Sequence, residues 1–152
     1  MTARLVMDQN PVLLKPDDKI AEAAEKFMQR RYRSLAVVDD EHRFLGVITV
    51  NTMLHLVLPK AATMANGVDD LSYMTDSMSD LRRRLSGSLD KPVSSFMVTN
   101  GVTIDPDTSL VETLLILYKE KVNLPVVDKS TGRLEGMISY YDIGERVFQE
   151  NS

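Results

Sequence analysis

The chain contains no cysteine and only two histidines among its 152 residues. Without cysteine it can form no disulfide, no thiolate metal site and no thiol nucleophile. His42 and His55 have no acidic or histidine partner at the spacing of metal ligands, so no metal site is expected. No apolar run approaches the roughly 20 residues that span a bilayer. Residues 1–10 carry one basic side chain and no apolar core, which argues against a signal peptide. We therefore expect a soluble cytoplasmic protein with no membrane partner.

An excess of positive charge is also missing. The 22 acidic and 18 basic residues give a formal net charge of −4, which disfavours non-specific binding to nucleic acid. One basic cluster, at 82–84, follows acidic residues at 76 and 80, and this order predicts a solvated helix. Gly-rich phosphate loops, nucleophile elbows and paired catalytic carboxylates are absent as well. An enzyme is therefore the least favoured class of protein.

The sequence does contain an internal repeat. At a shift of about 90 residues the chain aligns with itself over most of its length. The first matches join residues 7, 10, 12, 16, 17 and 22 with residues 97, 100, 102, 106, 107 and 112. The shift then shortens by one residue, so that Leu35 aligns with Leu124. It returns to its first value before Gly46, which aligns with Gly136. Matches in this order indicate an internal duplication.

Each copy has the pattern β-α-β-β-α. A short extended piece at 12–14 or 102–104 ends in a Pro-Asp turn. Apolar residues at helical spacing follow, beginning at Ile20 in one copy and Leu110 in the other. Two β-rich runs come next, at 34–39 and 44–49 and again at 124–128 and 134–139. Polar turns join the runs of each pair, which predicts hairpins. Closing helices are expected at 50–58 and 140–149.

Neither copy is expected to fold alone. A unit of roughly 50–60 residues buries only a marginal core. Strand runs such as Leu35-Ala-Val-Val38 are apolar on both faces and need cover on both sides. We therefore predict one compact α+β module, in which two motifs, 1–58 and 92–152, are related by a pseudo-two-fold axis.

Residues 59–91 form an insertion between the copies, predicted to be a loop followed by a helix. Apolar residues at 71, 74, 78, 81 and 85 follow spacings of three and four, as in a short heptad seam. The seam allows two interpretations. In the first, the helix covers part of the core; in the second, it faces a partner protein or a second copy of the chain.

The repeat resembles the CBS family. Copy two carries the runs Asn123-Leu-Pro-Val-Val-Asp128 and Gly136-Met-Ile-Ser-Tyr-Tyr-Asp142, which are similar to the strand and the glycine-to-aspartate motif of that family. The likeness covers roughly 7–58 and 92–149. It implies a tandem CBS pair, or Bateman module, with two clefts. In such pairs the clefts commonly hold AMP, ATP, S-adenosylmethionine or related ligands, and the modules often dimerise.

The resemblance places the main ligand cleft at the start of the last helix. Ser139 and Tyr140 lie where free backbone N–H groups and the helix dipole favour a phosphate. Asp142 can accept two hydrogen bonds from ribose hydroxyls. The spacing also fits a purely structural role, in which Ser139 caps the helix and Asp142 belongs to its first turn.

The opposite copy is expected to complete this cleft. Val12 and Leu13 would lie at the edge of the adenine, and Tyr32 against the base. Arg33 either neutralises a phosphate or ends a helix where a cation suits the dipole. The predicted main cleft comprises Val12, Leu13, Tyr32, Arg33, Ser139, Tyr140, Tyr141 and Asp142.

Copy one departs from the family pattern. Thr49 keeps the hydroxyl, but Thr52 stands where the ribose-binding aspartate is expected, and threonine offers no carboxylate. The second cleft is therefore expected to be empty, weaker or tuned to another ligand. Its predicted residues are Thr49, Asn51, Thr52, Val102, Lys121 and Asn123.

Two functions follow from these patterns. The first is a non-catalytic regulatory module that requires no cofactor, binds AMP, ADP, ATP or S-adenosylmethionine as a regulatory ligand, and signals to a separate effector protein, as a homodimer. The alternative is a structural dimerisation or protein-interaction module with vestigial clefts. Thr52 and the 71–85 seam favour this alternative.

Overall fold

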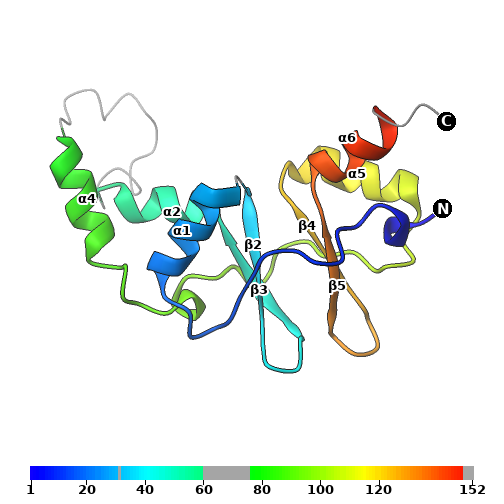
Figure 1. Ribbon diagram of the computed structural model, residues 1–152, viewed down its shortest axis with the longest axis horizontal. Coiled ribbons are helices and arrows are strands. Elements are labelled where there is room, and N and C mark those ends of the chain that lie inside the picture. Colours follow the sequence, from blue (N-terminus) through cyan, green and yellow to red (C-terminus); the bar gives the residue numbers. More distant parts are fainter. Residues whose placement is uncertain (31, 60–75, 149–152) are drawn as a thin grey trace.

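The structure, a computed structural model, describes residues 1–30, 32–59 and 76–148. Its elements are η1 (Ala3–Leu5), β1 (Leu13–Leu14), α1 (Ile20–Arg30), β2 (Ser34–Val38), β3 (Phe44–Thr49), α2 (Val50–Val57), α4 (Met78–Ser86), η3 (Val93–Ser95), α5 (Leu110–Glu120), β4 (Leu124–Val127), β5 (Leu134–Ile138) and α6 (Tyr140–Val147). Figure 1 shows two halves side by side, with the sheets in the centre and α1, α2, α5 and α6 outside them. The predicted α+β fold of two repeated motifs is confirmed.

The two hairpins are confirmed, and each forms the centre of a small sheet. In the first half β1 pairs parallel with β2, and β2 pairs antiparallel with β3. In the second half β4 pairs antiparallel with β5. The extended piece predicted at 102–104 pairs only through Ile104, in a parallel bridge with Val126. The second copy therefore keeps the position of β1 but has fewer backbone pairs there.

Each half is completed by a segment from the other copy. Asp8 pairs with Met137 of β5 through two backbone hydrogen bonds of 2.8 and 3.0 Å. Val98 makes the equivalent pair with Val47 of β3, at 2.8 and 3.0 Å. Residues 1–8 therefore pack with the second half, and residues 92–98 pack with the first. The repeat in the sequence shows the two motifs but not this exchange.

The exchanged segments are buried parts of the core. Ala3 and Val6 belong to the core of the second half, and Val93 belongs to the core of the first. Two glycines give the segments room. A Cβ on Gly46 would lie 2.7 Å from a carbonyl oxygen of the crossing segment, and a Cβ on Gly136 would lie 2.6 Å from its equivalent. Only glycine permits so close an approach of two backbones.

Contacts between the hairpin tips follow the pseudo-two-fold axis. The N–H of Phe44 donates to the carbonyl of Gly132, and the N–H of Leu134 donates to the carbonyl of His42, both at 2.9 Å. A shift of 90 residues converts each bond into the other. A small apolar cluster fills the space between the sheets: Ala36, Val38, Leu134 and Met137.

The insertion contains the predicted helix, but its seam is only partly described. Leu71 and Met74 lie outside the described residues. Met78 is 62% exposed, and Leu81 and Leu85 are half-buried. No residue of α4 is buried.

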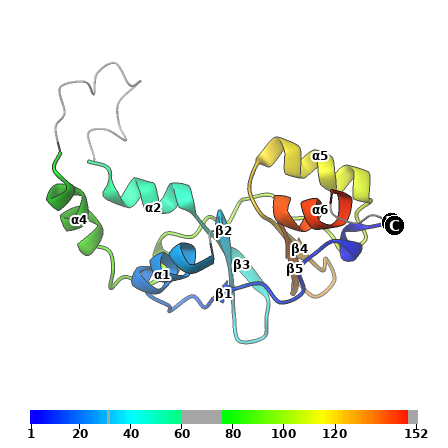
Figure 2. The same cartoon turned by 45° about the horizontal axis from the view of Figure 1, so that its top comes forward.

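Helix α4 packs against α2 rather than over the core, as Figure 2 shows at the edge of the first half. The Arg84 guanidinium donates to the carbonyl of Val57 at 3.0 Å and forms a 2.7 Å ion pair with Asp76. Leu89, beyond the end of the helix, packs against the core of the first half. Over the described residues, α4 therefore covers α2 rather than the core.

Candidate functional site

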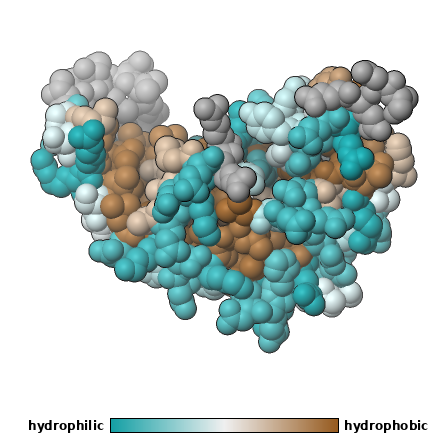
Figure 3. All heavy atoms as spheres, in the orientation of Figure 1, coloured by the Kyte–Doolittle hydropathy of each residue, from teal (hydrophilic) through white to brown (hydrophobic). Residues whose placement is uncertain are grey.

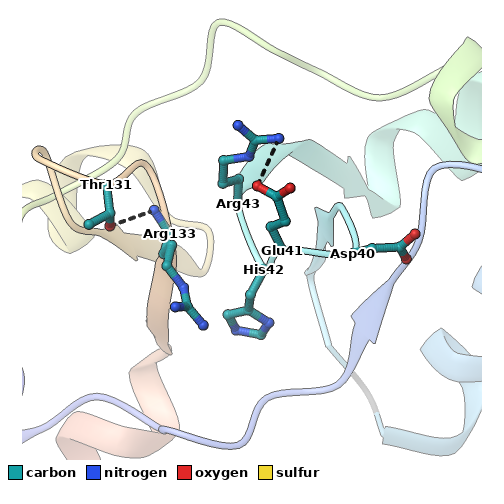
Figure 4. A pocket seen from close by; sticks show the side chains of 6 residues that line it. All are labelled: Asp40, Glu41, His42, Arg43, Thr131 and Arg133. Carbon is teal, nitrogen blue, oxygen red and sulfur yellow. Dashed lines mark hydrogen bonds and ion pairs between the residues drawn. The ribbon is translucent and has the colours of Figure 1, made fainter.

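Two cavities among the described residues are lined by residues of both halves. The first lies between the hairpin tips, has a volume of about 490 Å³, and is lined by Asp40, Glu41, His42, Arg43, Thr131 and Arg133. Arg43 forms ion pairs with Asp39 at 2.9 Å and with Glu41 at 3.2 Å. In Figure 4 Arg43 and Glu41 lie on one side of the tips, and His42 and Arg133 on the other. This cavity offers charged groups but no apolar wall for a base.

The second cavity, called the central cavity below, has a volume of about 830 Å³. It lies between α5, α6 and the segment that enters β2. Its lining residues are Asp8, Tyr32, Arg33, Leu114, Leu117, Tyr118, Lys121, Val122, Asn123, Met137, Ser139, Tyr140, Tyr141, Asp142 and Ile143. Figure 3 shows that the molecular surface is hollowed between the lobe with α1 and α2 and the lobe with α5 and α6. The central cavity combines apolar, acidic and basic walls and is the candidate site.

Asp142 and Ser139 form a capping box at the start of α6. The Asp142 Oδ2 atom accepts the Ser139 N–H at 2.7 Å and the Ser139 hydroxyl at 3.0 Å. The Ser139 Oγ accepts the Asp142 N–H at 3.3 Å. The structural role expected from the spacing is therefore present. No described residue donates to Oδ1, so this oxygen is the one that can accept a hydroxyl of a ligand.

The environment of Asp142 makes its ionisation costly. Burial raises the pKa of Asp142 above its ordinary value of 3.8, and the hydrogen bonds from Ser139 oppose that rise. The negative charges of Asp8 and Glu145 raise this pKa further. An ionised Asp142 therefore gains from any ligand that donates hydrogen bonds to it.

Two cations line the same cavity. The Arg33 Nη1 atom donates to the carbonyl oxygen of Lys121 at 3.3 Å, which brings the two residues together across the halves. Lys121 follows α5 directly and has a φ of 59°, a left-handed conformation that usually favours glycine. The pair supplies two positive charges that can neutralise a phosphate.

The structure brings together most, but not all, of the predicted main cleft. Tyr32, Arg33, Ser139, Tyr140, Tyr141 and Asp142 all line the central cavity. Val12 and Leu13 do not line it: Val12 packs against the core of the first half, and Leu13 against the cluster between the sheets. An adenine edge at these two residues is therefore not seen in this cavity.

The predicted second cleft is divided. Lys121 and Asn123 line the central cavity instead. Thr49, Asn51, Thr52 and Val102 line neither of the two cavities described above. The Thr49 Oγ1 atom lies 3.2 Å from both the amide nitrogen and the hydroxyl of Thr52. These threonines thus form a helix cap without a carboxylate.

Asp8 and the wall on α5 were missed by the sequence analysis. Asp8 reaches the cavity only because residues 1–8 pack with the second half. Leu114, Leu117 and Tyr118 belong to the apolar stripe predicted to begin at Leu110, and helical spacing does not separate a core face from a cavity wall.

The family model for the CBS domain matches two segments of the chain, residues 3–59 and 93–147. The chain belongs to the CBS-domain family. Its two matched segments are the two structural motifs, so the protein is a CBS pair.

Known proteins similar to this CBS pair include inosine-5′-monophosphate dehydrogenase of Aquifex aeolicus, 30% identical over 139 residues. That match covers 90% of this chain and 22% of the dehydrogenase. The chloroplastic CBS domain-containing protein CBSX2 of Arabidopsis thaliana is 25% identical over 134 residues, which cover 86% of this chain and 56% of CBSX2. The CBS pair thus spans only a part of these two curated relatives.

Solved structures show the same fold. The crystal structure of CBSX2 in complex with AMP superposes with a TM-score of 0.69 at 23% identity and covers 97% of this chain and 96% of that chain. A putative acetoin utilization protein from Vibrio cholerae superposes with a TM-score of 0.71 at 19% identity, covering 98% of this chain and 91% of that one.

Within the described ranges, no three histidine, cysteine or acidic residues gather where they could hold a metal ion. In the same part of the chain, no helix is long and apolar enough to cross a membrane.

Proposed function

We propose that this CBS pair is a regulatory module that binds an adenine nucleotide in the central cavity and signals to a separate protein. One observation carries the proposal. The cavity joins a carboxylate oxygen of Asp142 to which no described residue donates, two cations and an apolar wall. A ribose, a phosphate and a base require these three kinds of surface.

In the proposed complex each part of the nucleotide meets a different wall. The ribose hydroxyls donate to the Asp142 Oδ1 atom, and the phosphate lies between Arg33 and Lys121. The base packs on the apolar side chains of α5, such as Leu117. The AMP complex of CBSX2 supports an adenine nucleotide as the ligand class. S-adenosylmethionine shares the adenosine group and is the competing ligand.

A panel of AMP, ADP, ATP, NAD and S-adenosylmethionine at millimolar concentration tests the proposal by thermal shift. A nucleotide at about 100 times its Kd adds about 2.7 kcal/mol to the free energy of unfolding. For a domain of this size that corresponds to a rise in Tm of roughly 5–10 °C. A panel in which no compound raises the Tm would contradict nucleotide binding.

The second candidate function is self-association through helical faces. Val50, Leu54 and Leu58 form an exposed stripe in the first half, and Tyr140 and Phe148 occupy the equivalent positions in the second. Exposed apolar faces of this kind are typical of protein interfaces. We propose that the CBS pair forms a homodimer through these faces.

Light scattering on the full chain checks the oligomeric state. The wild type is expected to have the mass of two chains, and the variant Leu54→Glu with Phe148→Glu the mass of one. Replacing Glu25, an exposed residue outside these stripes, by lysine serves as the control. A wild type that stays monomeric at about 100 μM, a concentration at which even a dimer of Kd near 10 μM is mostly associated, would contradict the dimer.

A further inference from the structure

Asp8 is a charged residue that the fold does not require. Its backbone forms the bridge to Met137, but within the described residues its side chain makes a single hydrogen bond, in which Oδ1 accepts the N–H of Asn10 at 2.9 Å. The equivalent residue in the other copy is Val98, which forms the same bridge with Val47. The backbone bridge therefore does not require a charged side chain at this position.

The bridge places the Asp8 carboxylate beside the start of α6. Met137 lies in β5, two residues before Ser139, and Asp8 and Asp142 both line the central cavity. No described cation lies within 4.0 Å of either carboxylate. The charge of Asp8 also raises the pKa of Asp142, as expected for carboxylates that share a site.

The two acidic residues also occur together in one half of the molecule and are both replaced in the other. In the pseudo-symmetric positions of the first half, Val98 replaces Asp8 and Thr52 replaces Asp142. The half with the ribose-binding carboxylate is thus also the half with the second acid. This coincidence indicates that Asp8 serves the ligand rather than the fold.

The charges of the cavity limit the ligand it can accept. Arg33 and Lys121 supply two positive charges, and Asp8 and Asp142 supply two negative charges. A nucleoside monophosphate brings up to two negative charges, which the two cations can neutralise. A triphosphate brings about two more, and those additional charges have no cation among the described lining residues.

Resting on the proposed function, we infer that Asp8 is a specificity-determining residue, which makes the central cavity prefer a nucleoside monophosphate over a nucleoside triphosphate. Arg33 and Lys121 neutralise the first phosphate, so the Asp8 carboxylate acts mainly on the uncompensated negative charge of the additional phosphates. Magnesium, by neutralising the triphosphate, reduces the repulsion.

Titration calorimetry with AMP and ATP, in the absence of magnesium, tests the inference on the full chain. Asp8→Asn keeps the acceptor for Asn10, and Asp8→Val copies the other half of the molecule. Both variants are expected to bind ATP about 3- to 10-fold more tightly than the wild type does, because one like charge is removed from the cavity. The Kd for AMP is expected to change by less than about 2-fold, and 5 mM magnesium is expected to shrink the effect on ATP.

Glu145→Gln is the matched control, since it removes a negative charge near Asp142 from a residue that does not line the cavity. It is expected to leave the ratio of the two Kd values unchanged. If the wild type binds AMP and both Asp8 variants keep its ratio of the Kd for ATP to the Kd for AMP, the role of Asp8 is overturned. Nucleotide binding itself would then stand. A wild type and variants that bind neither nucleotide would overturn the proposed function together with this inference.

Discussion

Replacing Asp142 by asparagine is expected to weaken AMP binding by about 10- to 100-fold. A hydrogen bond to a charged group contributes about 1.5–3 kcal/mol, and the variant replaces the charged Oδ1 acceptor by an amide. Asparagine keeps an oxygen that can accept the Ser139 N–H, so the start of α6 is expected to survive. Titration calorimetry with AMP at pH 7.5 measures the loss, and unchanged affinity would place the ribose elsewhere.

The same variant is expected to raise the stability of the ligand-free protein at neutral pH. Because the folded pKa of Asp142 is raised, its favourable contribution to stability is fully present below the unfolded pKa and is lost as the pH rises through the folded pKa. At pH 7 the ionised wild-type side chain therefore weakens the fold. The asparagine variant is expected to melt at a higher temperature than the wild type at pH 7, and the difference is expected to shrink as the pH falls towards the ordinary aspartate value of 3.8. A variant that melts lower at pH 7 would show that the capping box outweighs burial.

Lys121→Gly is expected to move stability and affinity in opposite directions. Lysine at a φ of 59° costs about 1–2 kcal/mol relative to glycine, so the variant is expected to raise the free energy of unfolding by about 1 kcal/mol. Loss of the ammonium group is expected to weaken AMP binding by about 3- to 10-fold. Urea unfolding and calorimetry measure the two effects separately.

Two controls separate the causes of these effects. His42→Gly relieves the same backbone conformation, at a φ of 65°, away from the central cavity, so it is expected to stabilise the fold and leave AMP binding unchanged. Lys119→Gln removes a cation from α5 without touching the cavity and is expected to change neither quantity. If Lys121→Gly binds AMP as the wild type does, a role for this lysine in holding the phosphate is excluded.

The elements of the fold follow closely from local patterns. The strand predicted at 44–49 is β3, and the helices predicted to begin at 50 and 140 begin there. Period-two and period-3.6 patterns arise from contacts between residues a few positions apart, so one sequence carries them. The capping residues Ser139 and Asp142 were found for the same reason.

The walls of the site depend on contacts that local patterns do not contain. Asp8 comes to α6 through an exchanged segment, and Lys121 meets Arg33 across the two halves. Val12 and Leu13 were expected at the ligand but pack into apolar clusters. A repeat shows that two units exist, but it does not show which unit a connecting segment joins.

The exchange of segments also governs the order in which the chain can fold during synthesis. The first half lacks Val93 and Val98 until residues far beyond its own last helix have been made, and Ala3 and Val6, which are made earlier, have no core to join until the second half follows. Each half therefore closes a long loop before its core is complete, and loop closure of this kind slows folding. Residues 1–8 stay exposed to solvent until the second hairpin, β4 and β5, has been synthesised. We therefore expect the two halves to become protease-resistant together.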